Sequence, residues 1–462
     1  MDRINKFIGQ FPDLKYDGAK IVCLLCNTPF VCRSKRDCFR HVNSQKHKYK
    51  KCGHRSKDEF ALGLIFMLTA CNIPFKIVKK EPFRKLWAKY SPGHVLPSES
   101  TLRNYLPFAR QKTENSIKAA LKEKKLWLSC DETTDCKRNY ILSITVRTLE
   151  PLQYSSPLLL ANKRLSHRTG DAIHNVIRST LEKFELTPNQ VMMFVTDATT
   201  SMLRAGSYLK NDCSTLLHVT CLLHALHLVA ETIRRNYSDV DSLITNTTKI
   251  FLKSPKRVRE FRKHCPSIRE PPQPIPTRCG TWLQAAFYYY KHFHEIKPLI
   301  LQFNAEELIA IKESQLQFQS AQVEADLQTI HTNYVVIATA IEQLQNSSLA
   351  LRDQFKIVDE VEAMLYTLDG PKSVRVLDKY RSVLSKNADF ARLKQIYGYS
   401  SSTDPLVQLK DHFNYANITT VDTERSSSLY NSIFTQRRTS FSEKNVEAYA
   451  MMQMFSLANL DC

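Results

Sequence analysis

The sequence has little glycine and no long uninterrupted run of apolar residues. Only 10 of its 462 residues are glycine, which disfavours a glycine-rich loop around phosphate groups. The longest apolar stretch, residues 60–75, is interrupted by polar residues and by Pro74, and it is too short to cross a bilayer. Because no long apolar region follows Met1, the sequence predicts no secretory signal, and we expect no membrane partner.

Positive charge is in clear excess. The chain has 65 Lys and Arg against 45 Asp and Glu, which gives a net charge of +20. Such an excess favours phosphate backbones as partners, because basic side chains release condensed counterions. The 13 cysteines are an odd number at irregular spacing, which without a secretory signal indicates reduced thiols, some of them bound to metal. We therefore expect a cytosolic or nuclear protein that contacts nucleic acid.

Four residues near the N-terminus have the spacing of zinc ligands. Cys23 and Cys26 form a Cys-x2-Cys pair. Fourteen residues lie between Cys26 and His41, and five lie between His41 and His47. Two thiolates and two imidazoles complete a tetrahedral Zn²⁺ shell when the His pair lies on a helix. The segment has too few apolar residues for a core, so the metal would supply its folding energy. The basic residues around the His pair that we expect to contact DNA are Lys35, Arg36, Arg40, Lys46 and Lys48.

Other interpretations of this segment remain open. It can also be a basic loop without metal, and a zinc finger can bind protein instead of DNA, although the basic flank favours nucleic acid. Further candidate ligands, which fit the spacing less well, are Cys32, Cys38, Cys52 and His54.

Two aspartates follow segments that have the pattern of buried strands. Residues 126–130 lead to Asp131, and residues 191–196 lead to Asp197. Carboxylates held at strand ends can share a pair of Mg²⁺ ions, the arrangement that supports in-line phosphoryl transfer. Aspartates after strands are also typical of solvated turns. Further elements expected here are strands over 140–148 and 157–160 and a helix over 171–184.

The remainder of the chain has helical spacing. A helix is expected over residues 217–235, a proline-rich loop over 266–276, and almost continuous helix over 281–398. An amphipathic helix begins near Ser442, and its apolar stripe is more often core than a subunit interface.

Three segments resemble those that carry the acidic residues of hAT-superfamily DNA transposases: residues 128–135, 195–202 and 423–428. The resemblance implies a fold of the α/β plus all-α class, in which an RNase H-like mixed-sheet core is interrupted by an all-helical insertion and preceded by a small zinc finger. It also implies that Asp131, Asp197 and Glu424 are the catalytic ligands of Mg²⁺ or Mn²⁺. Ser201 and Ser427 depart from the usual Asn and Phe of the family.

Two more motifs resemble the same family. In the first, residues 218–224, the resemblance implies that Cys221 and His224 lie near the active site; an ordinary hydrogen-bonded His in a core helix is the alternative. In the second, residues 277–282, it implies that Arg278 and Trp282 contact DNA. Cys279 occupies the usual Trp position of that motif.

The N-terminal region resembles the BED-type fingers of transposases and the family of CGG triplet repeat-binding proteins. The matching stretches are Asp17–Cys23, Ser44–Lys48, Asn72–Phe75 and Leu96–Pro107. Near the other end, residues 437–447 resemble the hAT dimerisation region, which implies self-association as a dimer or higher oligomer. The expected organisation is a finger over 1–58, a helical DNA-binding or linker region over 59–122, core over 123–280, insertion over 281–405, and core with dimerisation region over 406–462.

The function that this resemblance implies is a nuclear protein that binds double-stranded DNA sequence-specifically and cleaves and transfers strands with Mg²⁺. The alternative is a domesticated, non-catalytic transcriptional or chromatin regulator whose core serves as scaffold. A third possibility is a protein whose finger binds other proteins; its association with DNA would be weak and insensitive to salt.

Overall fold

The computed structural model shows a mixed α/β protein that is mainly helical. It describes residues 8, 10–16, 20–24, 26, 28–30, 34–44, 47, 57–91, 95–275, 279–398, 404–436 and 441–460. The chain forms two compact units, Met1–Ser116 with Ala448–Cys462, and Ile117–Glu447. Within the described residues, no helix combines the length and apolar character needed to span a bilayer.

The first unit begins with a small antiparallel sheet in the order β1-β2-β3, followed by one helix. Its apolar core contains only a few side chains, among them Phe11, Leu14 and Ile21. So small a core agrees with the expectation that a bound metal stabilises this segment. The elements are β1 (Leu14–Tyr16), β2 (Ile21–Cys23), β3 (Thr28–Phe30) and α2 (Lys35–Val42).

The rest of the first unit is helical. Phe75 packs on Tyr449 with ring centroids 5.2 Å apart, and Gln453 donates a hydrogen bond to the carbonyl of Ala70. These contacts join residues far apart in the sequence. The elements are α4 (Lys57–Ala70), η1 (Phe75–Lys79), α5 (Glu81–Tyr90), α6 (Glu99–Leu121) and α19 (Glu443–Leu460).

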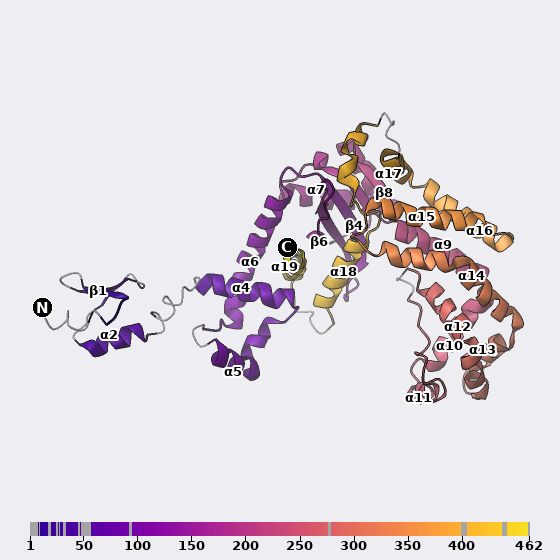
Figure 1. Cartoon of the computed structure of the whole chain (residues 1–462), viewed down its shortest axis with the longest axis horizontal. Coiled ribbons are helices and arrows are strands. Elements are labelled where there is room, and N and C mark those ends of the chain that lie inside the picture. Colours follow the sequence, from indigo (N-terminus) through magenta and orange to yellow (C-terminus); the bar gives the residue numbers. More distant parts are fainter. Residues whose placement is uncertain are drawn as a thin grey trace. The chain divides into compact units, whose positions relative to one another are not determined.

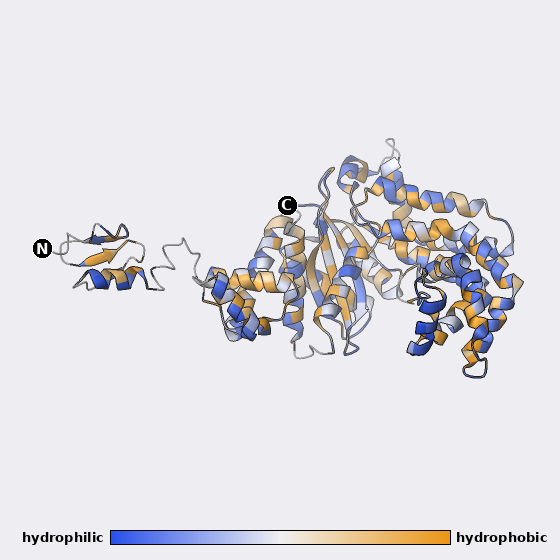
Figure 2. Ribbon diagram, turned by 60° about the horizontal axis from the view of Figure 1, so that its bottom comes forward, coloured by the Kyte–Doolittle hydropathy of each residue, from blue (hydrophilic) through white to orange (hydrophobic). Residues whose placement is uncertain are grey.

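A five-stranded sheet in the order β6-β5-β4-β7-β8 is the centre of the second unit. β4 pairs with β5 antiparallel and with β7 parallel, so the sheet is mixed. Figure 2 shows apolar residues along these strands, which agrees with strands buried on both faces. The strands are β4 (Leu126–Thr134), β5 (Tyr140–Thr148), β6 (Leu158–Arg164), β7 (Val191–Thr196) and β8 (Leu217–Thr220).

Two strand boundaries differ from the sequence-based expectation. β4 continues to Thr134, which pairs with Tyr140 of β5, so Asp131 lies within the strand instead of after it. Residues 217–220, expected as the start of a helix, form β8 and pair parallel with β7. A short apolar segment before a helix has no periodicity that separates strand from helix, so the sequence could not mark this boundary.

Helices lie on both faces of the sheet. Gly206 of α8 packs closely on His218 of β8 on one face. On the other face, α18 reaches β4 through a hydrogen bond from Thr423 to Ser129, and Figure 1 shows α18 beside β4. The helices near the sheet are α7 (Gly170–Lys183), η2 (Pro188–Gln190), α8 (Thr200–Asp212) and α18 (Val421–Ile433).

Between β8 and α18, every element that the structure describes is a helix. The helical pattern predicted over 281–398 is therefore confirmed. The chain meets the sheet again at α17, where Asp389 accepts a hydrogen bond from the backbone N–H of His218 in β8, and then as α18 (Figure 1). The elements are α9 (Leu222–Asn236), α10 (Ser238–Phe251), α11 (Pro255–His264), α12 (Thr281–Gln302), α13 (Ile309–Gln319), α14 (Ala321–Leu344), α15 (Leu351–Tyr366), α16 (Pro371–Ser385), α17 (Ala388–Gly398) and η3 (Pro405–Phe413).

Candidate metal centres

The four N-terminal Cys and His residues meet in the small sheet of the first unit. One ligand atom from each of Cys23, Cys26, His41 and His47 lies within 4.8 Å of the others. The Nδ1 atom of His47 is 3.2 Å from Cys23 Sγ and 3.8 Å from Cys26 Sγ. Two thiols and two imidazoles at these separations can hold a zinc ion, as the spacing predicted.

An additional residue orients this cluster. Nε2 of His47 lies 3.3 Å from a carboxylate oxygen of Asp13, which leaves Nδ1 directed at the two thiols. A carboxylate behind a metal-binding His fixes its tautomer and its orientation. His41 is held differently, because its ring stacks on Phe30 with centroids 4.2 Å apart. No local pattern connects Asp13 with this cluster, because it is 34 positions from His47.

The helix α2 carries part of the predicted DNA-contacting set. Lys35, Arg36 and Arg40 are exposed on it, and Arg40 lies 4.0 Å from Asp37. Cys38, one of the alternative ligands, is buried in the apolar core and does not belong to the metal cluster. The other residues predicted in this segment to contact DNA or bind metal lie outside the described residues: Lys46, Lys48, Cys32, Cys52 and His54.

In the second unit, Asp131 and Asp197 lie at the same level on neighbouring parallel strands. Ser129 of β4 pairs with Val195 of β7, and each aspartate follows its pair by two residues. Since side chains alternate along a strand, Asp131 is on the same face of the sheet as Ser129. The two carboxylates therefore belong to one edge of the sheet.

Glu424 approaches the same face from α18. Its neighbour Thr423 donates a hydrogen bond to Ser129 at 2.8 Å and contacts the hydroxyl of Thr145 at 2.6 Å. Asp131 is the next residue of β4 whose side chain lies on the same face as that of Ser129. The register of α18 on the sheet thus brings the third predicted carboxylate toward the first, although 293 positions separate them in the sequence numbering, from 131 to 424.

The charges at this edge act on one another. Burial, together with the negative charges of Glu424, Asp197 and Glu132, raises the pKa of Asp131 to about 7, against the opposing effect of His224. A carboxyl in this state gains from a nearby cation, because a cation would favour its charged form. The charges of Glu424 and Asp197 therefore both reach Asp131, whereas among the described residues the three acids do not form a group whose ligand atoms all lie within 4.8 Å of one another.

The Asp197 carboxylate is fixed by the start of α8. Its Oδ1 accepts hydrogen bonds from the backbone N–H of Thr199 at 3.1 Å and from its hydroxyl at 2.7 Å. Ser201, which departs from the hAT pattern, lies 3.4 Å from the same Thr199 hydroxyl. The other departure, Ser427, is buried and reaches Ser143 of β5 at 2.9 Å, so it takes part in the contact between α18 and the sheet.

Cys221 and His224 lie beside Glu424. One ligand atom from each of the three residues is within 4.8 Å of the others, and His224 Nδ1 is 3.9 Å from Glu424 Oε1. The interaction with Cys221 raises the pKa of His224 to about 10, with further contributions from Glu424 and Asp131. The sequence motif was expected near the predicted acids, and in the structure it lies beside one of them, Glu424.

A cavity of about 340 Å³ opens at this point. Asp197 and His224 line it together with two cations, Lys379 and Lys386. Of the three predicted acids, Asp197 lines this cavity, and the two lysines give the same space positive charge that would attract an anionic substrate. Cys279 also lies within reach of these charges. Burial, together with the charges of Cys221 and Glu424, raises the pKa of the Cys279 thiol to about 12.

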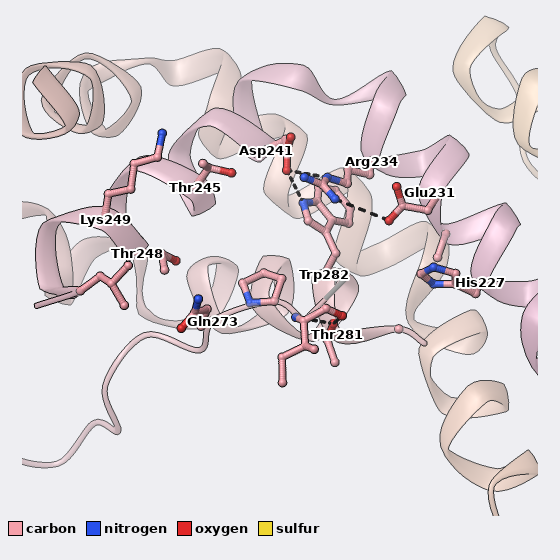
Figure 3. A pocket seen from close by; sticks show the side chains of 15 residues that line it. His227, Glu231, Arg234, Asp241, Thr245, Thr248, Lys249, Gln273, Thr281 and Trp282 are labelled. Carbon is pink, nitrogen blue, oxygen red and sulfur yellow. Dashed lines mark hydrogen bonds and ion pairs between the residues drawn. The ribbon is translucent and has the colours of Figure 1, made fainter. Parts of the chain in front are cut away.

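Trp282 lines a separate cavity of about 280 Å³ (Figure 3). Its side chain is 5% exposed, and its indole N–H donates to Asp241, 2.9 Å away. Arg234 donates to the same carboxylate oxygen at 2.8 Å. The indole is therefore held by α10 at the wall of the cavity, and its predicted contact with DNA stays a prediction. Arg278 lies outside the described residues.

The predicted apolar stripe of α19 is buried. Val446 and Ala450 have no exposed surface and Met454 is 8% exposed, whereas Leu457 is 52% exposed. A stripe that is buried within one chain is part of its core, which was one of the two interpretations of this helix. Residues 437–440 of the predicted dimerisation region are outside the described part of the chain.

One family model matches the sequence. Residues 103–250 match a domain of unknown function, DUF659, which is associated with hAT-type transposases. The matched segment begins in α6 and contains Asp131, Asp197 and the Cys221–His224 motif. No curated protein matches the chain. A relation to hAT transposases is thus supported for the first half of the sheet-containing unit.

Proposed function

We propose that this protein is a hAT-type DNA transposase, or a close derivative, that cleaves and transfers DNA strands with divalent metal ions. The observation that supports the proposal is that the charges of Asp197 and Glu424 both act on Asp131 at one edge of a mixed sheet, where strand register and the contact of α18 with Ser129 bring them near. The strand order β6-β5-β4-β7-β8, with the first three antiparallel and the last two parallel to β4, supports an RNase H-like core. The wholly helical stretch before α18 supports an insertion into that core.

The donor set fits Mg²⁺ or Mn²⁺. Carboxylate oxygens are the ligands these ions prefer. Burial, and then the neighbouring carboxylates, raise the pKa of Asp131, and a bound cation would favour its charged form. Bound at Asp131, Asp197 and Glu424, such ions would supply activation of the attacking oxygen and stabilisation of the leaving one. The protein itself holds the acids in place, through the β4–β7 register and the hydrogen bonds from Thr199.

The features that would recognise DNA lie at two places. The exposed Lys35, Arg36 and Arg40 of α2 would contact the backbone or bases of double-stranded DNA. In the second unit, Lys379 and Lys386 would attract phosphate groups to the acidic edge. A BED-type finger, action on genomic DNA in the nucleus, and self-association belong to the same proposal.

The second candidate is a regulator that binds DNA without cutting it. Cys279 replaces the tryptophan of the family motif, and the nearby Trp282 is buried and bonded to Asp241. Both observations remove an aromatic ring from the position where the family captures a base. They favour a derivative that has kept the scaffold and lost strand transfer.

Strand cleavage separates the two candidates. The substrate would be a DNA duplex carrying the genomic sequences that flank the protein's coding region, with a scrambled duplex of equal composition as a control. We expect nicking in the presence of Mg²⁺ or Mn²⁺, and its loss in Asp131→Asn and Glu424→Gln. Glu132→Gln is the matched control, because Glu132 follows Asp131 but pairs with Arg168 at 2.6 Å.

The outcomes are distinct. Metal-dependent cutting by the wild type and by Glu132→Gln, with none by Asp131→Asn or Glu424→Gln, supports the transposase. Tight binding by the wild-type protein without cutting supports the regulator. DNA binding that does not weaken steeply with salt contradicts both, since contacts with phosphates are salt-dependent.

A further inference from the structure

Glu424 lies between two different sets of ligands. On one side are the carboxylates of Asp131 and Asp197, and on the other are Cys221 and His224. The second set contains sulfur and nitrogen, which Zn²⁺ prefers over Mg²⁺. Cys221 is the N-cap residue of α9, His224 is in its first turn, and Glu424 is in the first turn of α18. Two helix starts therefore converge on one point.

The geometry of this second set is close to that of a zinc site. Ligand atoms around a tetrahedral Zn²⁺ lie roughly 3.3 to 3.8 Å apart, given bond lengths of about 2.0 Å to nitrogen or oxygen and 2.3 Å to sulfur. Here His224 Nδ1 and Glu424 Oε1 are 3.9 Å apart, and all three ligand atoms lie within 4.8 Å of one another. Small side-chain movements would close the site.

Thr420 contacts two of the three proposed ligands, Cys221 and Glu424. Its backbone N–H and its hydroxyl each point at Cys221 Sγ from 3.3 Å, and the hydroxyl is also 2.9 Å from Glu424 Oε1. The hydroxyl has one proton and donates to either the sulfur or Glu424, whereas the backbone N–H can donate to the sulfur throughout. Hydrogen bonds to sulfur stabilise the thiolate, the form that binds metal. Groups behind the ligands that fix them in this way are typical of metal sites.

His224 supplies an independent observation. Its Nδ1 atom is buried, and among the described residues it has no hydrogen-bond partner. A buried ring nitrogen without a partner is rare, because burying a polar atom unpaired is unfavourable. Glu424 Oε1 lies 3.9 Å from this atom and Cys221 belongs to the same cluster, so a cation between the three residues would satisfy it.

We propose that Cys221, His224 and Glu424 bind a Zn²⁺ ion, and that this ion withholds Glu424 from Mg²⁺ or Mn²⁺ at Asp131 and Asp197. The second clause rests on the function proposed above, whereas the zinc site does not. Three protein ligands leave one position of the zinc open, as in sites where a further ligand enters. Because Glu424 cannot coordinate both ions at full strength, zinc weakens the binding of Mg²⁺ or Mn²⁺ at Asp131 and Asp197.

Zinc content of the full chain tests the site. We expect one zinc ion in the finger and one at Cys221, so Cys221→Ser and His224→Gln each lose one equivalent relative to wild type. Cys26→Ser loses the other, and the double variant Cys26→Ser/Cys221→Ser loses both. The matched controls are Cys136→Ser and His227→Gln, a partly buried cysteine and the histidine one turn further along α9 that is not part of the cluster.

Cobalt substitution reports the ligands directly. Thiolate bound to Co²⁺ gives a near-ultraviolet charge-transfer band, which we expect to weaken in Cys221→Ser and to persist in Cys136→Ser. His224→Gln, which keeps the thiol, guards against a Cys221→Ser variant that merely fails to fold, and far-ultraviolet circular dichroism checks both. Zinc content and cobalt spectrum that are the same in wild type, Cys221→Ser and His224→Gln would overturn the proposal.

Competition tests the shared glutamate. Free Mn²⁺ is measured by electron paramagnetic resonance during titration of the wild-type chain, with and without saturating Zn²⁺. We expect zinc to weaken Mn²⁺ binding by about tenfold, within the range usual for coupled sites, and to have no effect in Cys221→Ser. Unchanged Mn²⁺ affinity would overturn the antagonism. Absence of Mn²⁺ binding without zinc would overturn the proposed function, and the zinc content would still decide the zinc site.

Discussion

Arg147 of β5 and Asp422 of α18 form a buried ion pair, although 275 positions separate them. Their side chains are 2% and 0% exposed. The guanidinium also donates to the carbonyl of Ser347 at 2.9 Å and lies over the ring of Trp127, 5.4 Å from its centroid. Glu424 follows Asp422 by two residues. This pair therefore fixes the helix that brings the third carboxylate to the sheet.

Breaking this pair should strongly destabilise the second unit. Arg147→Met leaves the Asp422 carboxylate buried without its partner, and losses of about 3–5 kcal/mol are typical of such changes. Urea unfolding measures the free energy. Lys356→Ala is the control, because its pair with Asp353 is exposed and should contribute at most about 1 kcal/mol. The double variant Arg147→Met/Asp422→Leu should recover part of the loss; equal stability of Arg147→Met and wild type would contradict the account.

Gly206 of α8 has no room for a side chain. A Cβ at this position would overlap the ring of His218, which is held by Thr196 at 2.9 Å and stacks on Phe194. Gly206→Ala should therefore destabilise by about 1–3 kcal/mol, as overpacking usually does. Thermal unfolding checks this, with Gly63→Ala in α4 as the control. Nothing lies within 4 Å of a Cβ at Gly63, so that variant should be neutral or more stable by up to about 1 kcal/mol.

Asp13 should tune the finger without being a ligand. Asp13→Asn removes the charge behind His47, and loss of such a partner typically weakens metal binding about 10- to 100-fold. Competition with a chromophoric chelator measures the zinc affinity. Asp37→Asn, an acid of α2 that contacts Ser34 and Arg40 instead, is the control and should leave the affinity unchanged. An equal loss of zinc affinity in Asp13→Asn and Asp37→Asn would show that the affinity depends on overall charge, and would contradict the specific role of Asp13.

Glu99 should make the first unit sensitive to acid. Hydrogen bonds from Lys79 and Arg103 lower the pKa of Glu99 to about 2 from an ordinary value of 4.5. A carboxyl whose pKa is depressed in the folded state stabilises it above pH 4.5, and the contribution is lost as the pH falls toward 2. In Glu99→Gln this contribution is absent, so the stability difference between wild type and variant should shrink between pH 5 and pH 3. Chemical unfolding followed over that interval measures it, and a constant difference would contradict the assignment.

The sequence predicted most of the elements around the acids. The β-branched and apolar residues of β4, β5 and β7 indicated strands, and the Cys and His spacing indicated the finger cluster, which the structure brings together. In both cases the signal is local, because it lies within one strand period or within a short run of ligands. The mixed α/β class followed from the same patterns.

What the sequence could not provide is long-range pairing. Asp13 and His47, and Arg147 and Asp422, are joined only by the tertiary fold, and no periodicity connects residues so far apart. β8 was missed because Leu217–Thr220 is a short apolar segment directly before α9. The contact of Thr420 with Cys221 is likewise long-range, and through Thr420 it connects Cys221 with Glu424. These are the contacts that turn separate motifs into one site.

The most direct test of the account is the binding of Mn²⁺ by the full chain, without DNA and with zinc confined to the finger by a chelator. We predict binding in wild type and in Glu132→Gln, and its weakening by more than about tenfold in each of Asp131→Asn, Asp197→Asn and Glu424→Gln, since each removes a ligand. Equal Mn²⁺ binding in wild type and all three variants would show that these carboxylates do not share a metal ion, and would contradict the central claim.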